Sequence, residues 1–129
     1  MYKYAHSYLK TTAIILQSFH GEMPFSNFIK QYFSVHKKFG GKDRKAIAEA
    51  CYSCYRLGKS LCTYTIEEKI KIGIFLCSLN IEKWTLIYED DWLTYSTQSF
   101  DQKINFIKQQ GFIIEPNDIF NYNILEMSI

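Results

Sequence analysis

The chain has 129 residues, a formal net charge of +2 and 47% hydrophobic residues. This length and composition predict one folded domain with its own core and exclude a disordered chain. The sequence has no run of about 18 apolar residues, which excludes a membrane-spanning helix, and its polar start does not fit a signal peptide. We therefore expect a cytoplasmic protein without a membrane partner.

The small net charge hides a strong segregation of charge along the chain. Residues 30–59 hold eight lysines and arginines and two acidic residues, a balance of +6. Residues 60–129 hold five basic and ten acidic residues, a balance of −5. Concentrated positive charge favours an anionic partner, but charge alone does not identify the anion.

The first predicted elements are three amphipathic helices. Helical spacing predicts one over residues 2–20, one from Pro24 to Phe39 and Gly40, and one from near Gly41 to Gly58. The second and third carry apolar residues at intervals of three and four: Phe25, Phe28, Ile29, Tyr32 and Phe33, then Ile47, Ala50, Cys51, Cys54 and Leu57. This spacing places each set on one helix face. The two segments therefore predict a helical hairpin that turns at a double glycine.

The second half of the chain contains two capping boxes, Thr65 with Glu68 and Ser99 with Gln102, which predict the starts of two helices. The helix after Thr65 is apolar nearly all round, which is typical of the buried centre of a bundle. Residues 80–95 predict a short helix followed by a loop. Five or six helices with short connections predict an all-α, compact orthogonal bundle.

The sequence shows no motif of a nucleotide-binding loop, a zinc peptidase or a serine hydrolase. Its cysteines are Cys51, Cys54, Cys62 and Cys77. Cys51 and Cys54 lie inside a helical pattern, and no second pair or nearby histidine completes a zinc site, so we expect buried, reduced thiols. The acidic run 89–91 is typical of a solvated turn or helix end. We expect no catalytic and no metal-binding residue.

The cations gather where the hairpin turns. The predicted RNA-binding residues are Lys37, Lys38, Lys42, Arg44, Lys45 and Arg56. Those near the turn are placed to contact a phosphate backbone, and Arg56 with Tyr52 to contact bases. The alternative is structural: Lys37 and Lys38 complement a helix dipole, and Arg44 pairs with an acid elsewhere.

The hairpin also resembles a known family. The resemblance is carried by Tyr32-Phe33, His36, Gly40-Gly41-Lys42-Asp43-Arg44-Lys45, Ile47, Glu49, Ala50, Tyr52 and Arg56. This run is similar to the N-terminal helical domain of the Fmu/Sun (RsmB-like) ribosomal RNA cytosine methyltransferases, with its Y-F-x-x-H, G-S-x-D-R-R and Y-x-x-x-R pattern. That domain has the fold of the antitermination factor NusB. The resemblance implies a NusB-like domain over residues 1–111 and a linker over residues 112–129. Gly41 stands where the family has a serine helix cap.

The resemblance implies a non-catalytic domain that helps to position ribosomal RNA or docks on its own methyltransferase domain. The family's catalytic domain, with its S-adenosylmethionine loop and a cysteine nucleophile after proline, has no counterpart in these residues, and no cysteine here follows a proline. We therefore expect no enzyme activity and no cofactor in this chain alone. S-adenosylmethionine is expected only in the catalytic domain of a longer protein, of which this chain is a fragment or a freestanding relative.

Two other functions stay open. A protein-interaction module, docking on the methyltransferase domain or on another protein, predicts an exposed aromatic patch around Trp84, Tyr88 and Trp92 and a basic turn whose charges do not matter. A freestanding NusB-like antitermination factor is the other. Charge reversal of Lys38 and Lys45 separates RNA binding from the protein-interaction module, because only RNA binding needs these charges.

Overall fold

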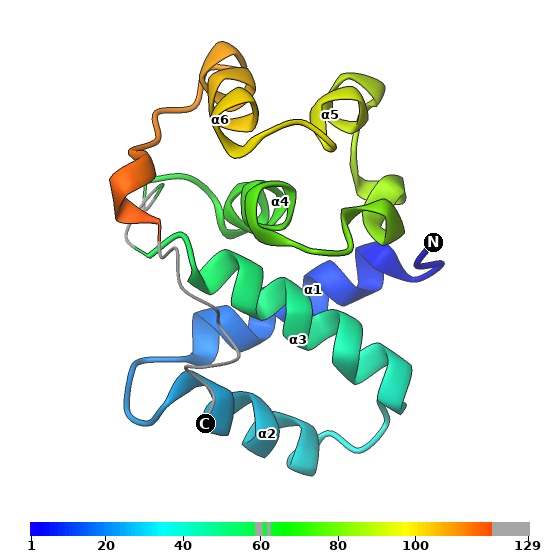
Figure 1. Ribbon diagram of the computed structural model, residues 1–129. Coiled ribbons are helices and arrows are strands. Elements are labelled where there is room, and N and C mark those ends of the chain that lie inside the picture. The colour runs from blue at the N-terminus through cyan, green and yellow to red at the C-terminus, as the bar shows by residue number, and fades with distance from the viewer. Residues whose placement is uncertain (59–60, 62, 120–129) are drawn as a thin grey trace.

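The computed structural model describes residues 1–58, 61 and 63–119 (Figure 1). Within these residues the chain forms six α-helices, two 3-10 helices and no strand. The elements are α1 (Ala5–Ser18), α2 (Phe25–Val35), α3 (Gly41–Tyr55), α4 (Ile66–Cys77), η1 (Ile81–Ile87), α5 (Asp90–Tyr95), α6 (Phe100–Gln109) and η2 (Pro116–Asp118). The predicted all-α bundle is confirmed. None of the helices in these residues is long and apolar enough to cross a membrane. The predictions for Lys59, Cys62 and residues 120–129 lie outside the described residues.

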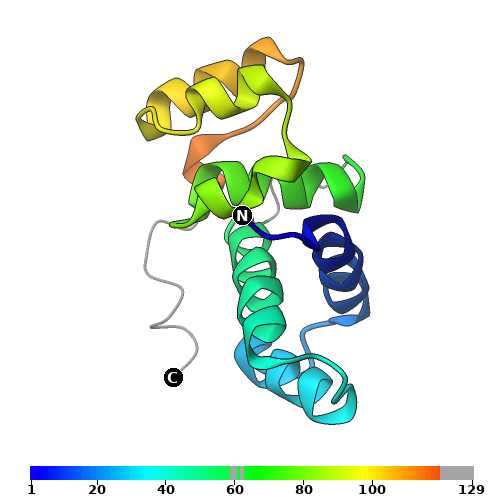
Figure 2. The same cartoon turned by 90° about the vertical axis from the view of Figure 1, so that its right-hand side faces the viewer.

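Helix α4 is the centre of the molecule. The helices α1 and α3 pack on one side of it, and α5 and α6 lie on the other (Figures 1 and 2). Its side chains at Ile70, Ile72 and Phe75 are almost completely buried, as the all-round apolar pattern predicted. The predicted capping box starts this helix: Glu68 N–H donates to Thr65 Oγ1 (3.2 Å), and Thr65 N–H donates to Glu68 Oε1 (3.1 Å).

The crossing of α3 and α4 depends on Gly73. A Cβ atom at this position would lie 2.7 Å from Cys54 Cα and 2.9 Å from the Ser53 carbonyl oxygen. Both atoms belong to the backbone of α3, which cannot move aside as a flexible side chain does. Glycine at residue 73 therefore allows the two helices to touch backbone to backbone.

Several predicted boundaries need correction. The first helix begins at Ala5 and ends at Ser18, and the second ends at Val35 rather than at Phe39. The loop predicted before residue 95 is wrong, because α5 occupies residues 90–95 with two carboxylates in its first turn, where the helix dipole favours them. The capping box of Ser99 and Gln102 is confirmed at the start of α6.

The structure contradicts the exposed aromatic patch that the protein-interaction alternative predicts. Trp84, Tyr88 and Trp92 are 0%, 8% and 5% exposed. Trp92 packs edge-to-face on Phe75 of α4, with 5.0 Å between ring centroids, and Trp84 packs in the same way on Tyr2, at 4.9 Å. Trp92 and Tyr88 thus pack on α4, and Trp84 packs on Tyr2 and on Tyr8 of α1, so these rings belong to the core and offer no docking surface.

The described part of the predicted linker packs on the bundle. The Ile113 N–H donates to the Tyr64 hydroxyl oxygen (2.9 Å), and the Phe112 ring meets the Tyr64 ring at a centroid distance of 5.1 Å. Ile114 and Ile119 are buried. Residues 112–119 therefore contribute side chains to the core.

We expect Gly73→Ala to lower the free energy of unfolding by about 1–3 kcal/mol, because the new methyl group meets the α3 backbone. Urea denaturation followed by circular dichroism measures this loss. Gly41→Ala is the matched control, since a Cβ atom there meets nothing within 4 Å; it should change stability by less than about 1 kcal/mol. Equal effects of the two substitutions would contradict the close crossing.

Candidate nucleic-acid interface

The turn between α2 and α3 is built by short-range contacts. The His36 N–H donates to the Tyr32 carbonyl oxygen (2.9 Å), and the two rings stack with centroids 4.1 Å apart. The N-cap of α3 is Gly40, and Gly41 is its first helical residue. The resemblance placed the cap at Gly41, one residue too late. The Gly40 N–H donates to Asp43 Oδ2 (3.3 Å). Glycine has no side-chain oxygen that could accept a hydrogen bond from the Asp43 N–H. Of the two hydrogen bonds of a capping box, only the one accepted by the Asp43 carboxylate can therefore form here.

Asp43 also ties the turn to α1. The Tyr8 hydroxyl donates a hydrogen bond to Asp43 Oδ1. Burial raises the pKa of Tyr8 to about 12, and the hydrogen bond to Asp43 and its negative charge act in the same direction. The one carboxylate in the turn is therefore engaged by a backbone N–H and a neutral hydroxyl.

Arg44 is held by the turn itself. Its Nε–H donates to the Phe39 carbonyl oxygen (2.8 Å). In the described part of the chain no carboxylate pairs with its guanidinium group. The acidic partner that the structural alternative requires is therefore not found among those residues. The single hydrogen bond fixes the plane of the guanidinium and leaves its terminal nitrogens for another ligand.

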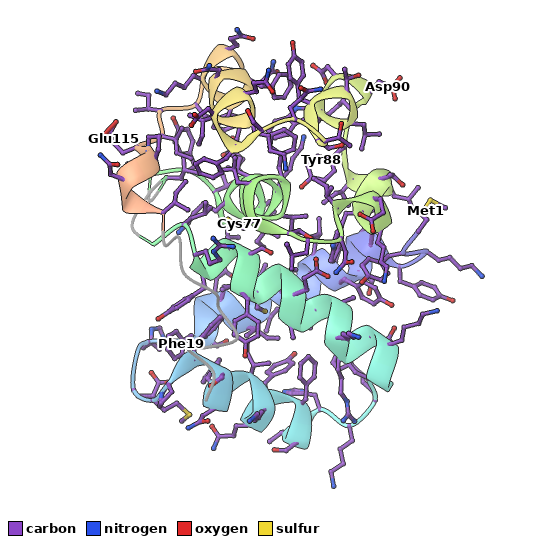
Figure 3. All side chains as sticks on the ribbon, in the orientation of Figure 1. Met1, Phe19, Cys77, Tyr88, Asp90 and Glu115 are labelled. Carbon is purple, nitrogen blue, oxygen red and sulfur yellow. The ribbon has the colours of Figure 1, made fainter. Side chains whose placement is uncertain are left out.

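A cleft of about 570 Å³ lies between α2 and α3, and we call it the cationic cleft. Its lining combines an apolar floor with a charged rim: Ile29, Phe33, Ala48 and Tyr52 below, and Lys30, Lys37, Arg44 and Lys45 around it, with Ser26 and Ser34. Large rings separate the two helices, as where Phe25 stacks on Tyr55 with 4.5 Å between centroids. Side chains occupy the space between α2 and α3, and Phe19 lies beside them (Figure 3).

No acidic side chain of the described residues forms an ion pair with the cations near the turn. Lys30, Lys37, Lys38, Lys42, Arg44 and Lys45 are all exposed. The ion pair formed within the described residues joins Lys71 Nζ to Glu89 Oε2 (2.7 Å), between α4 and the start of α5. Exposed positive charge therefore gathers around the turn and the two helices next to it.

The helix dipoles account for only part of this cluster. Helix α2 ends at Val35, so Lys37 and Lys38 lie just after its C-terminus, where the dipole attracts cations, as the structural alternative predicted. Lys42, Arg44 and Lys45 lie at the N-terminus of α3, where the dipole repels cations. Stabilisation of the helices therefore does not account for the three cations of α3.

The structure brings together only part of the predicted site. Lys37, Arg44 and Lys45 line the cationic cleft, whereas Lys38 and Lys42 lie at the turn outside its lining. Arg56 lies at the other end of α3, roughly 18 Å from Arg44 at 1.5 Å per residue. It is half-buried there, and its charge opposes the burial that raises the pKa of the Cys77 thiol.

Lys30 is the residue of the cleft that the predicted site left out. It follows Ser26 by four residues, so helical spacing places these two residues of the lining on the same face of α2. That signal was present in the sequence. The predicted site was limited to cations near the double glycine and to Arg56, and it took no account of which face of α2 is turned toward α3, so Lys30 was left out.

Two other features do not form a reactive site. Cys51 and Cys54 are buried and free, and burial raises the pKa of the Cys54 thiol to about 12, so both stay protonated. The second cleft, of about 310 Å³, contains Lys71 already paired with Glu89 and placed over the Trp92 ring at 4.4 Å. No three potential metal ligands gather within the described residues.

No protein-family model, curated protein or solved structure matches this chain. The resemblance to the Fmu/Sun domain therefore stays a prediction.

We expect Tyr8→Phe to lower the free energy of unfolding by about 1–3 kcal/mol at neutral pH, because a hydrogen bond to a charged group is lost. The folded-state pKa of Tyr8, about 12, lies above its ordinary value of 10.0. This contribution is therefore complete below pH 10 and fades as the pH rises toward 12.

Chemical denaturation across this pH range tests the expectation. The gap in stability between wild type and Tyr8→Phe should narrow as the pH rises. Tyr4→Phe, at an exposed tyrosine just before α1, is the control and should show no gap. A gap for Tyr8→Phe that is constant with pH would contradict the assigned hydrogen bond.

Proposed function

We propose that this chain is an RNA-binding module whose interface is the turn between α2 and α3 together with the cationic cleft. One observation carries the proposal: six exposed cations surround this turn and cleft, and none has an acidic partner in the described part of the chain. Phosphate groups of RNA are the anions that supply many negative charges at regular spacing.

Electrostatics supports a polyanion over a single small anion. The six cations come from both helices and from the turn, and four of them line one cleft. The potentials of charges within a screening length of about 10 Å add. The first N–H groups of α3 point to the same region and add partial positive charge. Such a surface attracts a phosphate backbone without reading its sequence.

The resemblance of the hairpin narrows the proposal. It supports a non-catalytic domain that positions ribosomal RNA for an S-adenosylmethionine-dependent cytosine methyltransferase of the Fmu/Sun type. The chain's partners would then be ribosomal RNA and its own methyltransferase domain, and the methyl-transfer chemistry and its cofactor belong to that domain. A freestanding antitermination factor would use the same surface. The protein-interaction alternative has lost the aromatic patch that it required.

The double charge reversal Lys37→Glu/Lys45→Glu tests the interface. Fluorescence anisotropy with a fluorescein-labelled stem-loop from ribosomal RNA should show a loss of affinity of about tenfold or more, because two phosphate contacts become repulsive. The slope of log affinity against log salt should fall by about 1.4, at roughly 0.7 per contact, for contacts with the single-stranded loop of the probe.

The matched control is Lys83→Glu/Lys108→Glu, which makes the same change in net charge at two exposed lysines of η1 and α6, outside the cleft lining. It should shift affinity only slightly and leave the salt slope unchanged. Equal losses of affinity in both variants would show that binding depends on the net charge of the chain alone, and would contradict an interface at the cleft. Binding by wild type that does not depend on salt would contradict a phosphate interface altogether.

A further inference from the structure

We propose that the cationic cleft holds an unpaired nucleotide, with its base against Tyr52 and its phosphates on the rim, so that the chain prefers single-stranded RNA to a duplex. This inference rests on the proposed RNA-binding function and adds the class of RNA that is bound. Four features of the cleft carry it: its size, its floor, its tyrosine and its rim.

The size and the floor of the cleft exceed what phosphate groups need. Its volume of about 570 Å³ falls within the range of roughly 300–1,000 Å³ that is typical of small-molecule clefts. Ile29 and Phe33, at 4% and 7% exposed, close it from below. An apolar floor offers no hydrogen bond and no charge to a phosphate group, whereas it favours contact with the flat, poorly hydrated face of a base.

Tyr52 provides an aromatic ring with an available hydroxyl group. The ring is half-buried and packs at 90° to Phe25, with 5.8 Å between centroids, which fixes its orientation. In the described part of the chain its hydroxyl has no hydrogen-bond partner. Burial raises the pKa of Tyr52, so the hydroxyl remains a donor at neutral pH. A ring for stacking beside a donor for the base edge is the usual recognition of unpaired bases.

The rim carries cations from both helices. Two of these cations are Lys30 of α2 and Lys37, just after α2. The other two, Arg44 and Lys45, belong to α3. The Arg44 guanidinium is already oriented by the Phe39 carbonyl oxygen, which reduces the entropy lost when its terminal nitrogens bind a phosphate. A nucleotide has phosphates on both sides of its sugar, and these would meet cations on both sides of the cleft.

A duplex does not fit this arrangement. Its bases are stacked inside the helix, and the major groove of A-form RNA is too narrow for side chains to read. Duplex RNA would therefore touch the rim but leave the floor and Tyr52 unoccupied. An acidic peptide would pair with the rim as well, but its carboxylates have no flat face for Tyr52.

The test compares three fluorescein-labelled probes of equal length on the wild-type chain: an oligouridine, the same backbone with abasic sites, and an RNA duplex. Stacking of one base contributes about 1–3 kcal/mol, which corresponds to roughly 5- to 150-fold in affinity. We expect the oligouridine to bind at least about tenfold more tightly than the abasic backbone or the duplex, with equal salt slopes for the two single strands.

Tyr52→Leu keeps an apolar side chain of useful size and removes the ring. It should bring the affinity for oligouridine down to that of the abasic backbone and leave abasic binding unchanged. Tyr52→Phe should keep most of the preference, because stacking is retained. Tyr4→Leu, at a tyrosine that is 63% exposed and lies outside the cleft lining, should behave as wild type.

The outcomes separate this inference from the function on which it rests. Salt-dependent binding that is equal for oligouridine and abasic backbone would overturn the nucleotide cleft and leave the phosphate interface standing. No binding to any RNA probe would overturn the proposed function. A glutamate-rich peptide that displaces oligouridine from wild type, and whose binding is abolished by Tyr52→Leu, would identify a peptide site and overturn the inference. If Tyr52→Leu does not fold, the three probes on wild type decide alone.

Discussion

The backbone contact between α3 and α4 at Gly73 is the constraint on which the rest of the structure depends. It places α3 directly against the buried central helix, so the orientation of α3 is set by backbone rather than by adaptable side chains. The N-terminus of α3 is then fixed a second time, because Tyr8 of α1 donates to Asp43 in its first turn. Two contacts far apart on one helix define a rigid axis, and the basic turn lies at the end of that axis.

The rigid axis explains how the chain tolerates six exposed cations around one turn and its cleft. Like charges repel, and three of them lie where the dipole of α3 is also repulsive. In a marginally packed hairpin such repulsion would open the turn. Here the core contacts of α3 and the bond of Arg44 to the Phe39 carbonyl hold it closed. The proposed RNA-binding function would account for charges that weaken the folded state and are still held together.

The sequence predicted the parts of the fold that depend on local chemistry. Both capping boxes and the buried character of α4 follow from side chains within one or two turns, and each is confirmed. The end of α2 did not follow in this way. The helical pattern continues through His36, whose N–H and ring still contact Tyr32 one turn earlier. The helix nevertheless ends at Val35, because the His36 backbone, with φ −100° and ψ 77°, is no longer helical. The patch of Trp84, Tyr88 and Trp92 failed for a related reason, because burial of a ring depends on which distant element covers it.

The candidate site shows the same division. Charge along the sequence located the basic turn, but it grouped Arg56 with the turn although α3 carries that residue to its other end. The cleft itself was not predictable, because its lining comes from two helices whose separation depends on tertiary packing, such as the stacking of Phe25 on Tyr55. Exposed cations give affinity and speed of association with little selectivity. Selectivity requires a surface of fixed shape, and in this chain the large aromatic side chains between α2 and α3 supply that shape beside the cations.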